Sequence, residues 1–216
     1  MIHVETFPVN PLSENTYVVS DDTHEAVIID CGAFTAKEQA AVADYISENR
    51  LRPVAHLLTH AHFDHCFGAV FVFERYGLAP RCHTADRPFL DDLPGQMRQI
   101  LGHALRCPQP TAGEDLTAQS VITFGTHRLT VIEMPGHSPG GICLYCPEED
   151  VLFSGDSLFQ MSIGRTDFPG GDHWTLIRGL QRLLRTLPPQ TRIYPGHGPA
   201  TTAADERQGN PFLGNE

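Results

Sequence analysis

The sequence predicts an α/β protein in which two β-sheets pack together and helices lie on the outside. Two observations support this: the predicted elements run as strands then helix twice, and each half ends in a loop that carries histidine. The 216 residues contain no short internal repeat and no low-complexity linker. We therefore expect a single domain over residues 1–216, large enough to bury a substantial core.

Apolar alternation and turn residues predict the elements of the first half. Thr35-Ala36-Lys37-Glu38 has the pattern of a capping box, which opens a helix that runs to about residue 49. A second helix is expected over 68–76, with Gly77 as its C-terminal cap. Strands are expected over residues 4–7, 16–20, 25–30, 54–58 and 81–83.

The second half shows weaker helical signals first and clear strands later. Asp172 is expected to cap a helix over 174–186, whose leucines lie on one side, and Leu187-Pro188-Pro189 ends it. The remaining expected elements are helical turns over 87–93 and 96–105 and strands over 121–124, 129–134, 142–145, 151–154 and 192–194.

Composition excludes several classes of partner. The formal net charge is −11, and an acidic surface repels phosphate backbones, so we expect no nucleic-acid partner. The N-terminus lacks the pattern of a signal peptide and no apolar run is long enough for a membrane span, so we expect a cytoplasmic protein. The six cysteines are then expected to be free thiols. Cys143 and Cys146 lie three apart on a predicted strand, hence on opposite faces, and do not form a metal or redox pair.

The segment His60-Ala61-His62-Phe63-Asp64-His65 is the strongest chemical signal in the chain. It follows a short buried strand, at the position where α/β folds place ligand sites. Four donor side chains within six residues are costly to gather unless a cation holds them. The segment therefore predicts a metal site.

Three further segments place a donor in a tight turn after a strand: Pro135-Gly136-His137, Ser154-Gly155-Asp156 and Pro195-Gly196-His197. Each is ordinary turn chemistry when taken alone. Together they supply three more ligands at strand ends.

The order of these motifs, H-x-H-x-D-H and then Pro-Gly-His, Ser-Gly-Asp and Gly-His, resembles the metallo-β-lactamase superfamily over nearly the whole chain. The resemblance implies a four-layer αββα sandwich with two metal ions at one edge. It implies that His60, His62 and His137 hold the first ion, that Asp64, His65 and His197 hold the second, and that Asp156 bridges them. The intact Asp64-His65 pair resembles the thioesterases of the superfamily more than its antibiotic-degrading members.

Imidazole and carboxylate ligands suit zinc, iron or manganese, and we expect two divalent ions, zinc first among them. A metal lowers the pKa of bound water, which supplies hydroxide at neutral pH. In this reading Asp64 is both a ligand and the catalytic residue that helps to orient the hydroxide.

The segment Gly164-Arg165-Thr166-Asp167-Phe168 resembles the small, single-domain branch of the glyoxalase II-like proteins. This resemblance makes Arg165 the substrate-binding candidate, although an arginine that bonds Asp167 or loop carbonyls is an equal interpretation. Glyoxalase II has Glu-Tyr after its last ligand histidine, where this chain has Gly198-Pro199, and we expect no C-terminal helical glutathione-binding domain. The expected activity is hydrolysis of a small-molecule thioester such as S-lactoylglutathione.

Two alternatives remain open at this point. The Arg-Thr-Asp-Phe segment also resembles persulfide dioxygenases, in which one iron would be held by His60, His137 and Asp156. A non-catalytic metal-binding protein is the second alternative. We also expect Asp30 to support the metal site from behind. The other histidines are expected to be exposed or satisfied, with His173 held open: His3, His24, His56, His83, His103, His127 and His173.

Overall fold

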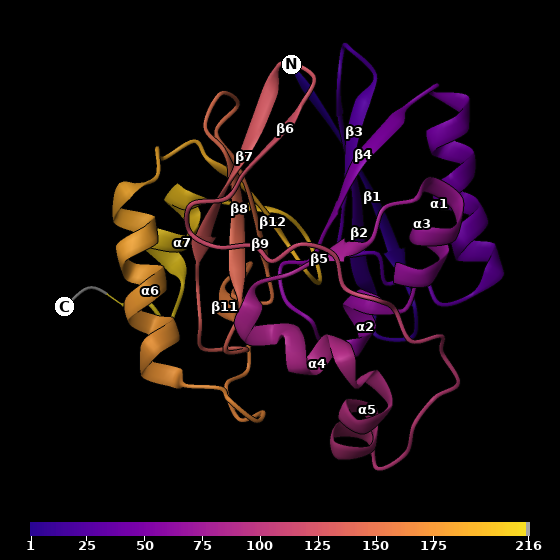
Figure 1. Cartoon of the computed structure of the whole chain (residues 1–216). Coiled ribbons are helices and arrows are strands. Elements are labelled where there is room, and N and C mark those ends of the chain that lie inside the picture. Colours follow the sequence, from indigo (N-terminus) through magenta and orange to yellow (C-terminus); the bar gives the residue numbers. More distant parts are fainter. Residues whose placement is uncertain (215–216) are drawn as a thin grey trace.

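The first sheet has five strands and comes from the N-terminal part of the chain (Figure 1). The computed structural model describes residues 1–214. The sheet order is β1-β2-β3-β4-β5; β1, β2 and β3 pair antiparallel, whereas β3, β4 and β5 pair parallel. The strands are β1 (Ile2–Val9), β2 (Glu14–Asp21), β3 (Glu25–Ile29), β4 (Arg52–Leu57) and β5 (Pro80–Arg81).

The second sheet has six strands in the order β13-β12-β9-β8-β7-β6. All its neighbours pair antiparallel except β9 and β12, which are parallel. A separate hairpin is formed by β10 (Leu158–Phe159) and β11 (Ser162–Ile163). The strands of the sheet are β6 (Val121–Phe124), β7 (His127–Glu133), β8 (Ile142–Cys146), β9 (Val151–Gly155), β12 (Arg192–Pro195) and β13 (Thr201–Thr202).

Helices cover the outer face of each sheet, so the layers run α, β, β, α as predicted (Figure 1). Helices α1 (Ala36–Glu48) and α3 (Ala69–Tyr76) pack on the first sheet, and α6 (His173–Thr186) and α7 (Ala203–Gly209) on the second. Shorter helices lie at one end of the sandwich: α2 (Phe63–Cys66), η1 (Thr84–Asp86), α4 (Arg87–Asp91) and α5 (Leu93–Leu101). Within residues 1–214, no helix has the length and apolarity that a bilayer crossing requires.

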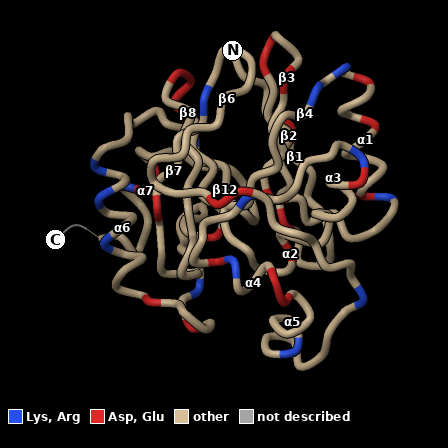
Figure 2. Tube along the Cα trace, viewed as in Figure 1, with Lys and Arg blue, Asp and Glu red and all other residues tan. Residues whose placement is uncertain are grey.

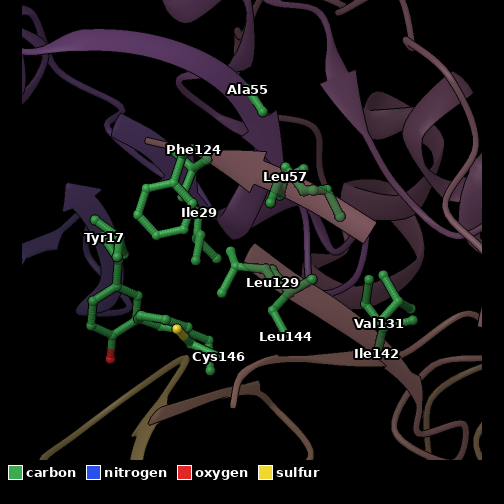
Figure 3. Close-up of a cluster of buried hydrophobic side chains, with 14 of the residues drawn as sticks. Tyr17, Ile29, Ala55, Leu57, Phe124, Leu129, Val131, Ile142, Leu144 and Cys146 are labelled. Carbon is green, nitrogen blue, oxygen red and sulfur yellow. The ribbon is translucent and has the colours of Figure 1, made fainter. Parts of the chain in front are cut away.

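The two sheets bury their facing side chains against each other (Figure 3). Tyr17 of the first sheet meets Phe153 of the second edge to face, with ring centroids 5.2 Å apart. Ile29 and Leu57 face Leu129 and Leu144 in the same layer, and all four are fully buried. Each such side chain stabilises the fold by about 1.5–3 kcal/mol, which makes this layer a main source of stability.

Helix α6 shows how the sequence pattern sets the outer layer. Leu176, Leu180 and Leu183 are buried on one side, whereas Arg178 and Arg182 are exposed on the other. Figure 2 shows several blue Lys or Arg segments along α6. The side chain of Asp172 caps the helix by accepting a hydrogen bond from the Thr175 amide, as predicted.

Most predicted elements are present, and several boundaries differ: the helical turn expected over 87–93 is Arg87–Asp91, and the next helix begins at Leu93. The helix expected over 96–105 ends at Leu101, because Gly102 adopts the left-handed conformation (φ 79°) that closes a helix. The strand expected over 81–83 is Pro80–Arg81, and His83 makes only an isolated bridge to Leu116. The hairpin β10–β11, strand β13 and helices α2 and α7 were not predicted, because each is too short to show periodicity.

The six cysteines, all within the described residues, are free thiols as expected. Cys143 lies under α6 in the outer core, whereas Cys146 lies in the core between the sheets. The two side chains therefore point to opposite faces of β8, as the spacing predicted.

Candidate metal centre

All seven predicted metal ligands lie together at the end of the sandwich where α2 is found. His60 and His62 lie in the loop after β4, and Asp64 and His65 in α2. The remaining three follow strands of the second sheet, at the ends of β7, β9 and β12: His137, Asp156 and His197. The cluster is thus shared between the two sheets, and neither half of the chain contains it alone.

The donor atoms form overlapping groups, in each of which all the atoms lie within 4.8 Å of one another. One group is His60, His62 and His137, and another is Asp64, His65 and His197. Asp156 lies between them: its carboxylate oxygens are 3.4 Å from His65 Nε2 and 3.6 Å from the Nε2 atoms of both His137 and His197. The arrangement has the form of two adjacent cation sites with a shared carboxylate.

Several buried donor atoms of this cluster lack a protein partner. Nε2 of His60, Nε2 of His65 and Oδ1 of Asp156 are buried and make no hydrogen bond to the described residues. Unsatisfied buried polar atoms are costly, and here they converge on one another. The residues therefore fit divalent cations. Because every donor atom is a nitrogen or an oxygen, the set suits zinc, iron or manganese.

Contacts behind the rings set which ring nitrogen faces the cluster. His137 Nδ1 lies 2.7 Å from the carbonyl oxygen of Arg165, and His197 Nδ1 lies 3.0 Å from that of Leu12. A carbonyl only accepts, so each Nδ1 carries a proton, which leaves Nε2 of the neutral ring as the nitrogen that can bind a cation. Outer contacts of this kind orient metal-binding histidines in general.

Asp30 lies behind His65, as expected. Its Oδ2 is 3.3 Å from His65 Nδ1, and the carboxylate also accepts hydrogen bonds from the Thr59 amide (2.7 Å) and hydroxyl (2.6 Å). Asp30 therefore connects α2 to the loop that begins at the end of β4.

Burial and charge set the protonation of the cluster. Burial, reinforced by the neighbouring rings, lowers the pKa of His60 well below its ordinary value and that of His62 to about 3. Burial would raise the pKa of the Asp156 carboxyl, but the His65 charge outweighs it and holds the pKa well below the usual range. Neutral His60 and His62 and the ionised Asp156 are in the protonation states that bind cations. Burial would lower the pKa of His65 and of His197, but the Asp64 and Asp156 carboxylates outweigh it and raise both, so these two rings lose a proton when a cation binds.

A cavity of about 610 Å³ opens over the cluster. It is reached by His62, Asp64, His137, Asp156 and His197, and its remaining wall is mostly apolar. The wall side chains come from separate segments of the chain: Leu12, Phe63, Ile100, Leu101, Phe159, Arg165 and Phe168. The volume is in the range of small-molecule sites.

Arg165 lies on this wall and is held by its own loop. Its guanidinium donates two hydrogen bonds to the Asp167 carboxylate, at 2.7 and 2.6 Å, and lies 4.0 Å from the centre of the Phe168 ring. The sequence left two interpretations of Arg165, a substrate-binding residue or a structural residue that bonds Asp167. The contact with Asp167 is present, and the Arg165 side chain also borders the cavity.

Sequence reasoning missed the buried polar residues that surround the cluster. Glu14 is fully buried, with Oε1 3.8 Å from His65 Nδ1, and burial raises the pKa of its carboxyl well above the ordinary value. Asp86 and Gln96 are buried against the loop that carries His62. A single Glu, Asp or Gln in a short element carries no sequence signal of burial, since these residues are mostly exposed.

The other histidines lie outside the cluster. His173 is exposed at the start of α6, where its ring packs against Trp174. His127 is satisfied by Asp21 and Glu149, each 3.0 Å from a ring nitrogen. His56 differs from expectation, because it is fully buried in β4 and neither ring nitrogen has a hydrogen-bond partner among the described residues.

Comparison with known proteins agrees with this geometry. Residues 9–197 match the family model of the metallo-beta-lactamase superfamily. The chain therefore belongs to the metallo-β-lactamase superfamily, and the αββα sandwich with a donor cluster at its edge is the fold of that family.

Two named relatives match this chain over nearly all of its length. The chain is 36% identical to a probable metallo-hydrolase, YqgX, of Bacillus subtilis, over 95% of each chain. It is 32% identical over the full length of both chains to the hydroxyacylglutathione hydrolase GloC of Haemophilus influenzae.

Two solved structures are matched over their whole length. BLEG-1, titled a B3 metallo-beta-lactamase, is 39% identical with a TM-score of 0.89, covering 99% of this chain and all of its own. TTHA1623, solved in a di-iron-bound form, is 38% identical with a TM-score of 0.84, covering 97% of this chain and all of its own.

Proposed function

We propose that this protein is a metal-dependent hydrolase of acyl thioesters. The observation that supports it most strongly is the seven-donor cluster beneath a largely apolar cavity. The full-length similarity to a hydroxyacylglutathione hydrolase makes S-lactoylglutathione the first substrate to test.

In this proposal two divalent ions are held by the two donor groups. His60, His62 and His137 would hold one ion, and Asp64, His65 and His197 would hold the other, with the Asp156 carboxylate between the two donor groups. We expect zinc first, and iron is the second metal to test because TTHA1623 was solved in a di-iron-bound form. When bound, such ions lower the pKa of a coordinated water and polarise a carbonyl oxygen.

The protein side chains orient the reaction. The Asp64 carboxylate lies 3.3 Å from His197 Nε2 and borders the cavity, so in this proposal it would help to orient the attacking water. Water adds to the acyl carbon and the carbon–sulfur bond breaks, so the products are a carboxylate, a thiol and one proton; of the two protons of the water, one goes to the sulfur and the other to solvent. A thiolate departs as the anion, and the reaction therefore needs less help from a proton donor than amide hydrolysis does.

The apolar wall and Arg165 divide the cavity into two environments. Phe159, Phe168 and Leu12 contact a substrate through apolar surface, and Arg165 is the cation of the wall. A substrate carboxylate would have to compete with Asp167 for that guanidinium. We therefore expect acyl thioesters of neutral thiols to be accepted as well as those of glutathione.

A second candidate is an iron-dependent persulfide dioxygenase, in which His60, His137 and Asp156 would form the two-His, one-carboxylate set of such sites. His137 Nε2 lies 3.6 Å from the Asp156 carboxylate, and the His60 and His137 ring centroids are 4.9 Å apart. β-Lactam hydrolysis is a third activity to test, since BLEG-1 carries that name. A non-catalytic metal-binding protein would bind ions and turn over none of these substrates.

One set of assays separates these functions. Purified protein is measured for bound metal, thiol release from S-lactoylglutathione and S-acetyl-N-acetylcysteamine, oxygen uptake with glutathione persulfide, and β-lactam ring opening. Two ions with thiol release support the proposal. One iron per chain with oxygen uptake and no thiol release from the thioesters would replace the proposal with a dioxygenase activity. β-Lactam ring opening alone would replace it with a lactamase activity.

A further inference from the structure

Asp86 is a buried carboxylate that the proposed reaction does not use. It ends the short helix η1, is fully buried, and accepts three hydrogen bonds from two different loops. Its Oδ2 accepts from the Ala61 amide (3.0 Å) and the Ser138 hydroxyl (2.8 Å), and its Oδ1 accepts from the Gly140 amide (2.6 Å). One carboxylate therefore joins the His60–His62 loop of the first sheet to the His137 loop of the second.

Gln96 of α5 holds the same donor loop from another side. Its Nε2 donates to the Ala61 carbonyl (2.9 Å), and its Oε1 accepts from the Phe63 amide (2.8 Å). His62 lies between Ala61 and Phe63 in the chain, at the start of α2, and its side chain does not cap that helix. The Gln96 side chain therefore satisfies a helix-start amide that would otherwise lack a partner.

Close packing fixes the distance between the two loops. A Cβ atom on Gly140 would lie 2.6 Å from the Asp86 backbone nitrogen and 2.8 Å from the Asp86 Cγ. The loops close around the carboxylate with no room for a side chain at position 140, and His137 Nε2 lies 2.8 Å from His62 Nδ1 where they meet.

The other donor group has different supports. Asn10 Nδ2 donates to the Asp64 carbonyl (3.0 Å), and the Leu12 carbonyl accepts from His197. Both residues belong to the turn between β1 and β2. Asp86 and Gln96 thus contact the loops of the first group, and the β1–β2 turn contacts the second group. Asp30 contacts both, through His65 and the Thr59 amide.

We propose that Asp86 and Gln96 are positioning residues for the His60, His62 and His137 group, and that the segment 84–101 sets the metal affinity of that half of the centre. This rests on the proposed two-ion site. Outer contacts of metal-binding groups typically change affinity by about tenfold to a hundredfold.

The test is a titration of metal-free protein with Zn²⁺ against a chelating dye, together with Co²⁺ titration followed by its visible spectrum. Asp86→Asn keeps the size of the side chain but turns one acceptor into a donor that faces other donors. Gln96→Leu removes both contacts to the donor loop and provides a second variant should Asp86→Asn fail to fold.

Asp21→Asn is the matched control. Asp21 is also a buried carboxylate, accepting hydrogen bonds from the Thr126 amide (2.7 Å) and the Thr23 amide (2.9 Å). It ends β2, seven residues beyond Glu14 at the metal end, which is roughly 23 Å away at about 3.3 Å per residue. Its loss lowers stability without touching a donor loop.

We expect Asp86→Asn to bind one of the two ions about tenfold to a hundredfold more weakly, with the other within about threefold of wild type. Gln96→Leu should weaken the same ion, and Asp21→Asn neither. If the wild-type protein binds two ions, and Asp86→Asn and Gln96→Leu bind both with the affinities of Asp21→Asn, the positioning role alone is overturned. Wild-type protein that binds no divalent ion would overturn the proposed function and this inference with it.

Discussion

The Nδ1–H of His137 donates a hydrogen bond to the main-chain carbonyl of Arg165, across 2.7 Å. This contact joins a donor ring of the metal centre to the loop that forms part of the cavity wall. Because the acceptor is a carbonyl, it remains when the Arg165 side chain is changed. Side-chain variants at 165 therefore report on substrate binding with the His137 ring still held.

Arg165→Ala should raise KM for an anionic thioester more than it lowers kcat. The change removes a hydrogen bond between the exposed guanidinium and the anionic substrate. Such a bond contributes about 0.5–1.5 kcal/mol, which corresponds to a roughly two- to tenfold change in KM. Asp167→Asn is the matched variant, because it frees the guanidinium from its partner and should lower KM for the same substrate. Steady-state kinetics measure both, and a KM unchanged in both variants would leave Arg165 a structural residue.

Asp156→Ala should lose bound metal and activity together. Its carboxylate lies within 3.6 Å of rings from both donor groups, so a single change removes a contact from each. Metal analysis of the purified variant should find well below the wild-type content. Asp22→Ala removes a carboxylate that is 78% exposed and should keep wild-type metal content. Full metal occupancy in Asp156→Ala would contradict the position of Asp156 between two ions.

Two neighbouring glycines should respond differently to alanine. A Cβ on Gly196 would lie 2.1 Å from Asp156 Oδ1 and 2.8 Å from His65 Cε1, so Gly196→Ala should displace donors and abolish metal binding. Gly198 has a φ of 76° and nothing within 4 Å of an added Cβ. Gly198→Ala should therefore cost about 1–2 kcal/mol of stability through the backbone but keep the metal. Equal metal content in both variants would show that the packing at Gly196 does not matter.

His56 should make the fold sensitive to mild acid. Burial lowers the pKa of its ring to about 3, below the value of about 6.5 expected in the unfolded chain. Between these values the unfolded state binds a proton that the folded state does not, so stability present above pH 6.5 is lost as the pH falls. Between pH 7.5 and pH 5 the loss is about 2 kcal/mol.

Urea unfolding of metal-free protein at these two pH values measures the effect. His56→Leu should lose about 2 kcal/mol less than wild type over this interval, because its side chain takes up no proton. His103→Gln changes an exposed histidine and serves as the control. The same pH dependence in His56→Leu and wild type would contradict a neutral, buried His56.

The strands, the outer helices and the order of the donor motifs were predictable because each has a local signal. Thr35 and Glu38 form the capping box that their spacing indicates, and α6 buries the leucines that its periodicity places on one face. The short elements α2, β13 and α7 lack such a period, and the end of α5 depends on a single glycine at 102. These were missed or misplaced for that reason.

The sequence by itself determined which side chains to expect in the cluster, because the His60–His65 run and the order of the three later turn motifs resemble one family, although each turn alone is ordinary. Tertiary structure decided what holds them. Asp86 is 25 residues from Ala61 and 54 from Gly140 in the chain, and Leu12 is 185 residues from His197. Common residue types and main-chain carbonyls act there, and only folding of the two sheets against each other brings them within hydrogen-bond distance.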